Sequence, residues 1–237
     1  MTAFPGCCSD PSRSSFGFVK QAPDLARLAL AGVRAGESLA PLESLGSLLA
    51  LSLTFEGPRS PMIVDLNRVP SGVRELTLIS SDKAVDVSLF PELDYLFVAD
   101  RVVSIHGLET VQDLRALRVQ SSALTAHQIA ALRVPRTLRS FRLWSPRITD
   151  VSWLPELSDL EELDLTDCRQ VRSLSGIHGL TTLRRVGLSG LDRLHDLTPL
   201  LDLPCLSEIS CYGRRRADET TARLEASGVR VSGLMAS

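Results

Sequence analysis

The chain has 237 residues, of which 44% are hydrophobic and 23% charged, and its 26 basic side chains nearly balance its 28 acidic ones. This composition disfavours a disordered tail and a strongly basic nucleic-acid-binding module. Leucine supplies 41 residues whereas the aromatic residues together supply only 11, a bias that favours one small packing unit repeated along the chain.

The first 22 residues carry no recognisable targeting signal. They lack an apolar stretch behind a basic start, so a secretory signal is not expected. Charged residues also interrupt every hydrophobic run in the chain before it reaches the roughly 18 residues that a membrane helix requires, so no membrane span is expected. Residues 1–22 are predicted to be irregular or a partial cap, with Phe16 and Phe18 folding over the first repeat.

The five cysteines stand at positions 7, 8, 168, 205 and 211, which fits neither a disulfide framework nor the paired spacing of metal ligands. We therefore expect a reducing, cytoplasmic environment, no metal site and no cofactor. Only Lys20 and Lys83 among the 26 basic residues are lysines, an arginine bias typical of a GC-rich bacterial genome.

A six-residue pattern, L-x-x-L-x-L, recurs through most of the chain, and successive copies begin 20 to 25 residues apart. A tenth, degenerate copy begins near Ala226 and places Val229 and Val231 in its last two apolar positions. Residues 23–237 are therefore predicted to form one domain of about nine to ten repeats. The nine clear copies begin at Leu25, Leu48, Val73, Leu93, Leu114, Leu138, Leu160, Leu183 and Leu206.

The apolar spacing predicts the course of the chain within a repeat. In the three stretches that lead to Leu163, Val186 and Ile209, an apolar residue recurs at every third position. This period fits neither an α-helix nor a strand but suits 3₁₀ or extended segments, whereas the x-L-x-L portion alternates and predicts a short strand. Stacked repeats would align these strands in parallel, about 4.8 Å apart, and bury each set of leucines against its neighbours.

Three segments are expected to depart from the simple repeat. Residues 56–61 contain two prolines and a glycine and are predicted to form an inserted loop. Residues 125–132 have helical propensity, with Thr125 as the N-cap and with Leu124 and Ile129 facing inward. Residues 216–227 are predicted to form a last helix before a final strand near 229–231.

The copy at residues 160–168, LEELDLTDC, resembles the hallmark L-x-x-L-x-L-x-x-N/C-x-L of the leucine-rich repeat family. Cys168 takes the Asn/Cys position, whose side chain bonds the turn backbone in that family. The spacing of 22 to 23 residues is similar to that of short, internalin-like bacterial repeats. The resemblance implies an α/β fold, a curved horseshoe solenoid with a parallel concave sheet and mostly 3₁₀ or extended convex segments. Less regular turns are expected where the Asn/Cys position holds other residues: Glu56, Ser81, Arg101, Ser122, Pro146, Leu191 and Arg214.

Familiar catalytic and phosphate-binding motifs are absent from the sequence, including G-x-x-x-x-G-K-S/T, G-x-G-x-x-G, H-E-x-x-H and G-x-S-x-G. His106 and His178 recur in the same string, Ile-His-Gly-Leu, and are interpreted as two copies of one convex turn. Glu161, Glu162 and Asp164 are interpreted as a solvated strand face and not as a pair of glycosidase carboxylates. The protein is therefore predicted to have no catalytic residues and not to be an enzyme.

The leucine-rich repeat architecture commonly binds its partners with the x side chains of its strands, which project from the concave face. Four of the 11 aromatic residues fall in this set and are interleaved with arginine, a composition typical of protein-interface hot spots. The alternative is that these rings only pack flat on neighbouring strands. The predicted partner-binding residues are Tyr95, Phe97, Arg118, Arg142, Trp144, Asp164 and Tyr212.

Charge is segregated along the chain. Residues 114–147 hold seven arginines and no acid, and residues 148–167 hold seven acids and no base. In register, Arg139 would lie beside Glu161 and Arg142 beside Asp164, and Glu161 would then meet Arg184, which predicts a ladder of cross-strand ion pairs. Basic side chains left over would steer an acidic partner.

Together these observations predict a cytoplasmic, non-catalytic module that presents a rigid concave surface to a partner protein. An alternative is the ligand-sensing part of a NACHT-type signalling NTPase without its NTPase domain. A minor alternative is nucleic-acid binding through the arginines of residues 115–147, which the neighbouring acidic block disfavours because it repels a long polyanion.

Overall fold

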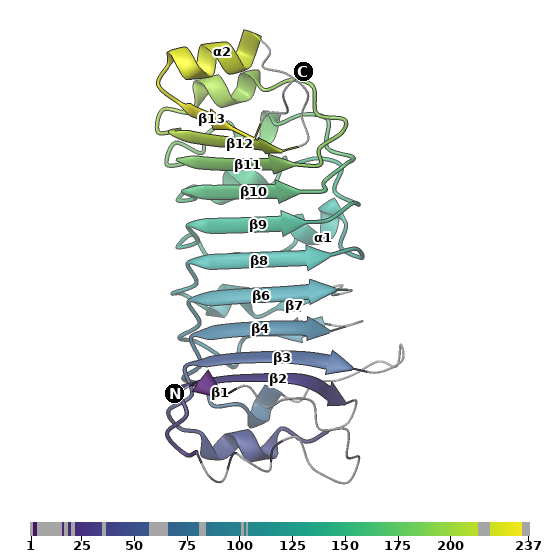
Figure 1. Ribbon diagram of the computed structural model, residues 1–237, viewed down its shortest axis with the longest axis vertical. Coiled ribbons are helices and arrows are strands. Elements are labelled where there is room, and N and C mark those ends of the chain that lie inside the picture. Colours follow the sequence, from purple (N-terminus) through teal and green to yellow (C-terminus); the bar gives the residue numbers. More distant parts are fainter. Residues whose placement is uncertain are drawn as a thin grey trace.

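The computed structural model describes residues 2–3, 16, 19, 22–34, 37–56, 66–80, 84–100, 102, 104–212 and 219–233. Within these residues a sheet of eleven parallel strands runs the length of the molecule, with the strands stacked like rungs (Figure 1). The strands of this sheet follow one another in chain order, and only β5 and β7, which belong to a second sheet, intervene in the chain. The strands are β1 (Thr2–Ala3), β2 (Arg27–Arg34), β3 (Ala50–Glu56), β4 (Glu75–Ser80), β6 (Tyr95–Asp100), β8 (Ala116–Ser121), β9 (Ser140–Trp144), β10 (Glu162–Thr166), β11 (Arg185–Ser189), β12 (Glu208–Tyr212) and β13 (Arg230–Ser232).

The return segments lie behind the sheet, and most of them are short 3₁₀ helices (Figure 1). This confirms the predicted solenoid with a parallel sheet on one face and 3₁₀ turns on the other. The 3₁₀ segments are η2 (Ala40–Ser44), η3 (Leu66–Arg68), η4 (Leu108–Thr110), η5 (Leu154–Glu156), η6 (Ser175–Ile177) and η7 (Thr198–Asp202). Two short strands, β5 (Ala84–Asp86) and β7 (Ser104–His106), pair in parallel in a separate sheet.

The repeat leucines form one continuous apolar cluster between the sheet and the return segments. In the repeat that contains β10, the first three consensus positions, Leu160, Leu163 and Leu165, are exposed by 0%, 2% and 0%. Side chains alternate along each strand, so these leucines point inward while their neighbours point to the open face of the sheet, the face predicted to be concave. Each repeat buries its apolar side chains against the repeats beside it, and the stack is the source of stability.

A polar ladder runs beneath the ends of three strands and satisfies buried backbone carbonyls. The Cys168 thiol, which is fully buried, donates to the carbonyl oxygens of Thr166 and Leu143 at 3.6 and 3.8 Å, so the predicted role of Cys168 is confirmed. The Ser145 hydroxyl donates to Leu124 at 3.1 Å, and the Ser121 hydroxyl donates to Val102 at 2.7 Å.

Counting along the repeat places Ser122 and Pro146 at the Asn/Cys position, but the side chains that reach the buried carbonyls in those repeats are Ser121 and Ser145. Ser121 and Ser145 are each the seventh residue after the first leucine of their repeats, and they directly follow the register partners Gln120 and Trp144. Cys168 comes two residues after β10, because Asp167 adopts a left-handed φ of 51° between the strand and the buried position.

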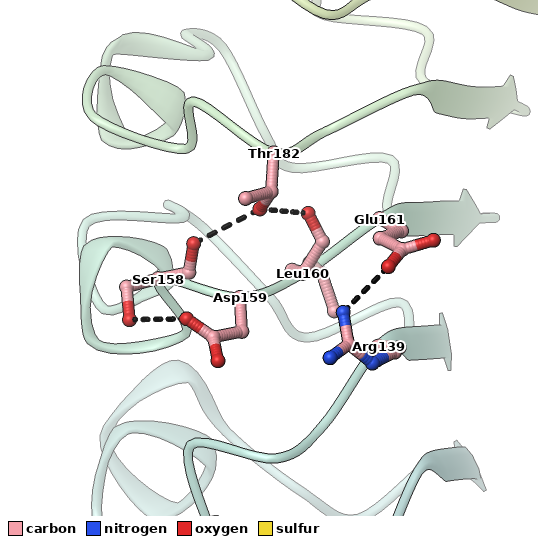
Figure 2. A network of polar contacts seen from close by, with 6 residues as sticks. All are labelled: Arg139, Ser158, Asp159, Leu160, Glu161 and Thr182. Atoms are coloured by element: carbon pink, nitrogen blue, oxygen red, sulfur yellow. Dashed lines mark hydrogen bonds and ion pairs between the residues drawn. The ribbon is translucent and has the colours of Figure 1, made fainter.

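A second device repeats where the chain enters the strands. Figure 2 shows the Thr182 hydroxyl between the carbonyl oxygens of Ser158 and Leu160, 3.0 and 2.8 Å away. The same arrangement occurs two repeats earlier, at Thr137. Its hydroxyl lies 2.8 and 3.2 Å from two carbonyl oxygens of the preceding repeat. Each threonine thereby ties its own repeat to the one before it.

Two α-helices interrupt the 3₁₀ pattern. The predicted helix at residues 125–132 is α1 (Ala126–Ala130), and Thr125 caps it in a capping box with Gln128. Leu124 and Ile129 are buried, as predicted. The predicted last helix is α2 (Glu219–Ala226), followed by β13. None of the helices described is long and apolar enough to cross a lipid bilayer.

Two expectations concern segments that the structure describes only in part. Phe16 is buried in the main cluster, whereas Phe18 lies outside the described residues. The predicted loop at residues 56–61 lies outside them as well, apart from Glu56 at the end of β3.

Candidate binding surface

The open face of the sheet carries three rows of side chains that cross the strands, because the parallel strands pair without a shift from β3 to β13. The first row is Arg27, Ala50, Glu75, Tyr95, Ala116, Ser140, Glu162, Arg185, Glu208 and Arg230. The middle row is Ala29, Ser52, Thr77, Phe97, Arg118, Arg142, Asp164, Gly187, Ser210 and Ser232. The third row is Ala31, Thr54, Ile79, Ala99, Gln120, Trp144, Thr166, Ser189 and Tyr212.

The acids and bases of the first row neutralise one another. Arg27 reaches over β3 and donates two hydrogen bonds to the Glu75 carboxylate, at 2.8 and 3.0 Å. Arg185 pairs with Glu162 on the neighbouring strand. The third pair joins Arg230 and Glu208, whose charged atoms are 3.9 Å apart. No acid or base of this row is left for a partner without breaking an internal pair.

The middle row differs, because its three charged side chains form no ion pair within the described residues. Arg118 and Arg142 are exposed and lie directly opposite each other on β8 and β9. The Arg118 guanidinium lies over the Phe97 ring, 4.5 Å from its centroid, in a cation–π contact. The Arg142 side chain has no hydrogen bond or ion pair in the described part of the chain. Asp164 is half-buried and accepts a hydrogen bond of 2.8 Å from the Thr166 hydroxyl.

Two predicted aromatic residues stand in the third row, on β9 and β12. The Trp144 indole N–H donates to the Asp167 carboxylate at 2.9 Å, which fixes the half-buried ring at the edge of the face. Two large hydrophobic side chains are exposed among the described residues, and Tyr212, at 60%, is the more exposed of them. Tyr95, in the first row, is half-buried.

A hollow of about 370 Å³ connects Arg142 and Asp164 with Tyr212. Its floor is Gly187, where a Cβ atom would lie only 3.1 Å from the Asp164 carboxyl carbon. The missing side chain therefore makes room for both the hollow and the Asp164 carboxylate. Gly187 is not among the predicted site residues, and its only signal in the sequence is a glycine at an outward strand position between two charged repeats.

The seven predicted residues thus form one group and one outlier. Phe97, Arg118, Arg142 and Asp164 are consecutive in the middle row, Trp144 is beside Arg142, and Tyr212 joins through the hollow. Tyr95 lies instead against a smaller hollow at the other end, with Arg27 and Glu75.

The predicted ion-pair ladder is confirmed in part. Arg139 and Glu161 pair at 2.5 Å (Figure 2). Arg142 and Asp164 are register partners, but no ion pair joins them in the described chain. The expected contact of Glu161 with the Arg184 side chain is wrong, since the Arg184 backbone N–H donates to the Glu161 carbonyl, and the ion pair of these strands is Glu162 with Arg185.

Two histidines and one cysteine have surroundings that bear on their reactivity. His106 ends β7 and His178 follows η6, so the prediction that they repeat one turn is wrong, although Gly107 and Gly179 after them both have positive φ. His178 lies 4.0 Å from the Asp202 carboxylate. Burial raises the pKa of the Cys168 thiol to about 11, and the charges of Asp167 and Asp164 add to the effect. Within the described residues, no cluster of three or more His, Cys, Asp or Glu side chains has the arrangement of a metal site.

No protein-family model and no curated protein matches the chain. Among solved structures, an internalin (inlF) from Listeria monocytogenes matches with a TM-score of 0.55 and 19% identity, over 92% of this chain and 69% of the internalin. Internalin C2 from the same organism matches with a TM-score of 0.53 and 17% identity, over 95% of this chain and 94% of the other. The chain has a leucine-rich repeat fold of the internalin-like type.

The leucine-rich repeat fold accounts for the geometry of the candidate surface. Its repeats hold the backbone of the three rows at the strand spacing, about 4.8 Å, so the side chains are positioned before any partner arrives. At 17 to 19% sequence identity the likeness shows the fold alone. It gives no information on the surface residues of this leucine-rich repeat chain.

Proposed function

We propose that the protein is a non-catalytic module that binds a partner protein through the middle row of its open face. The contact surface comprises Phe97, Arg118, Arg142 and Asp164, with Trp144 and Tyr212 at its edge. Rigid aromatic rings beside multidentate arginine donors are the residue types that dominate binding energy at protein interfaces.

One observation carries the proposal. Arg118 and Arg142 lie directly opposite each other on neighbouring strands, and neither forms an ion pair within the described residues. Like charges in this position destabilise a sheet. An acidic side chain from a partner would relieve the repulsion and accept hydrogen bonds from both guanidinium groups. The neighbouring first row shows that the same sheet readily forms ion pairs, so the open charges are a property of the middle row.

The experiment is a pull-down from lysate of the source cell, with the wild type beside the variant Phe97→Ala, Arg142→Ala, Trp144→Ala. The matched control is Arg27→Ala, Glu75→Ala, which removes exposed side chains of the first row while keeping the net charge. Circular dichroism first establishes that all three proteins are folded. We expect a protein that the wild type and the control retain and the triple variant loses, with Arg142→Ala alone weakening binding by about 2 kcal/mol.

Other outcomes contradict the proposal. Equal retention by all three proteins would mean that the rings only cover the strands. Retention of nucleic acid in place of a protein, lost with Arg142, would support the minor alternative. A retained NTPase would favour the role of a NACHT-type sensor. The proposed cytoplasmic location is tested separately, by fractionating the cells and probing each fraction for the protein.

A further inference from the structure

The back of the solenoid opens between α1 and η5. Along the neighbouring repeats, consecutive 3₁₀ segments pack on one another, η5 on η6 and η6 on η7. The repeat that begins at Leu114 contains α1 in place of a 3₁₀ helix. A cavity of about 290 Å³ lies between this return and η5 (Figure 1 shows α1 behind β8 and β9).

The floor of this cavity is apolar and reaches the core of the protein. Phe141 from β9 and Trp153 pack edge to face there, with ring centroids 5.4 Å apart. The Trp153 indole N–H donates to the Asp150 carbonyl at 3.3 Å, so its polar atom is already satisfied. Leu132 and Leu157 complete the floor. Trp153 and Leu132 are each 8% exposed, among the highest values of the buried core, because the core opens here.

The rim of the cavity is charged. Arg133 and Arg136 stand on the α1 side, both exposed, and neither has a hydrogen bond or ion pair in the described part of the chain. Glu156, at the end of η5, is the acid on the opposite side. An apolar floor with two available guanidinium groups matches a molecule that has a hydrocarbon body and one carboxylate.

We propose that this cavity is a binding site for a small amphipathic carboxylate. The hydrocarbon body fills the space against Phe141 and Trp153, and the carboxylate accepts hydrogen bonds from Arg133 and Arg136. Glu156 sets the specificity of the site, because its charge repels a second anionic group on the ligand. The site is on the opposite side of the sheet from the middle row and does not depend on the function proposed there.

The test uses octanoate as the probe, with 1-octanol and octylamine as neutral and cationic counterparts. The chain has two tryptophans, so Trp144→Phe leaves Trp153 as the only indole that reports on the cavity. In this background we expect octanoate to shift the Trp153 emission saturably, with a dissociation constant on the order of 0.1 to 1 mM for so small a ligand.

Three variants examine the parts of the site. Arg133→Ala with Arg136→Ala should weaken octanoate binding at least about tenfold and leave 1-octanol unchanged, because a carboxylate loses its charged donors. Glu156→Gln should strengthen octanoate binding. Ala130→Phe, which places a ring in the cavity lining, should abolish the shift. Its matched control, Ala131→Phe, adds the same ring next to it on a residue outside the lining, and should bind as the parent does.

Several results would overturn the proposal. The first is the absence of a saturable shift up to about 10 mM octanoate, a concentration far above the expected dissociation constant. The others are equal binding of octanoate and octylamine, and octanoate binding that survives the loss of both arginines. Binding that persists in Ala130→Phe, with circular dichroism unchanged, would place the probe elsewhere on the protein.

Discussion

The first and middle rows of the open face lie side by side on the same strands, yet they treat charge in opposite ways. Every acid and base of the first row is paired within the protein, from Arg27 with Glu75 to Arg230 with Glu208. The middle row keeps Arg118, Arg142 and Asp164 without ion pairs in the described chain. The backbone is the same in both rows, and register alone does not decide the pairing, because Arg142 and Asp164 are register partners without an ion pair, whereas Arg27 pairs with Glu75 across an intervening strand. Neighbouring rows of one solenoid can therefore differ in charge pairing while they share the same backbone.

The largest effect is expected in the apolar core, which lies beneath both the first and the middle row. Leu163 is 2% exposed and lies between Phe141 and Val186 in register. Leu163→Ala should lower the free energy of unfolding by about 2 to 5 kcal/mol, through lost burial and a residual cavity. Urea unfolding followed by circular dichroism measures it. The matched control is Leu49→Ala, the same change at a side chain that is 49% exposed, which should cost less than about 0.5 kcal/mol. Similar losses at both sites would contradict the assigned core.

The next prediction uses pH to distinguish the buried Cys168 thiol from the exposed charges of the middle row. Cys168 is buried in the ladder, and its pKa rises from the ordinary value of 9.0 to about 11. Below pH 9 the thiol is protonated in both states and its contribution to stability is complete. As the pH rises from 9 to 11 the unfolded thiol ionises first, so stability falls by on the order of 2 to 3 kcal/mol. Urea midpoints at a series of pH values measure this loss.

Cys168→Ser is the control for that series, because serine keeps a hydrogen-bonding group at the position and does not titrate in this range. The remaining titratable groups are common to both proteins, so the difference between their curves isolates Cys168. Parallel curves between pH 9 and pH 11 would show that the thiol is accessible to water in the folded protein.

A smaller effect would sharpen the boundary of the middle row. Gly187→Ala places a methyl group 3.1 Å from the Asp164 carboxyl carbon and fills the floor of the hollow. We expect partner binding to weaken about fivefold, or roughly 1 kcal/mol, because Asp164 must shift and the hollow narrows. Titration of the partner recovered by pull-down measures this change. Ser232→Ala, in the same row two strands further on and outside the lining of the hollow, should leave binding within twofold of the wild type, roughly the scatter expected of a neutral surface change.

Much of this arrangement follows from the sequence, because a strict period leaves little freedom. The alternation around Leu163 and Leu165 predicted which side chains face outward, and the repeat spacing predicted that Arg142 would be the register partner of Asp164. What alternation does not specify is the rotamer of a long side chain. Glu161 and Glu162 are adjacent in sequence, and which of them meets an arginine on β11 depends on side-chain direction.

The turns were less predictable than the strands, for a physical reason. A single left-handed residue, such as Asp167, moves the buried polar position by one residue, and consensus counting cannot detect it. The hollow over Gly187 and the cavity beside α1 are also spaces left between side chains, and a pattern of residue types does not contain them. The sequence likewise did not show that Tyr95, unlike the other predicted aromatic residues, lies against the smaller hollow and away from the middle row.

The smallest effect tests whether the first row contributes to stability at all. Arg27 and Glu75 are bonded through two hydrogen bonds across an intervening strand, but both side chains are about half exposed, at 58% and 44%. Solvent screens such a pair, so a double-mutant cycle with Arg27→Ala and Glu75→Ala should give a coupling energy of about 0.2 to 1 kcal/mol, decreasing with added salt. Urea unfolding of the four proteins at low and high salt measures it. A coupling well above 1 kcal/mol, insensitive to salt, would mean that the first row is a structural brace. The charge pairs of the first row would then serve mainly to stabilise the fold. With a weak coupling energy, their main consequence is that they neutralise the face beside the middle row.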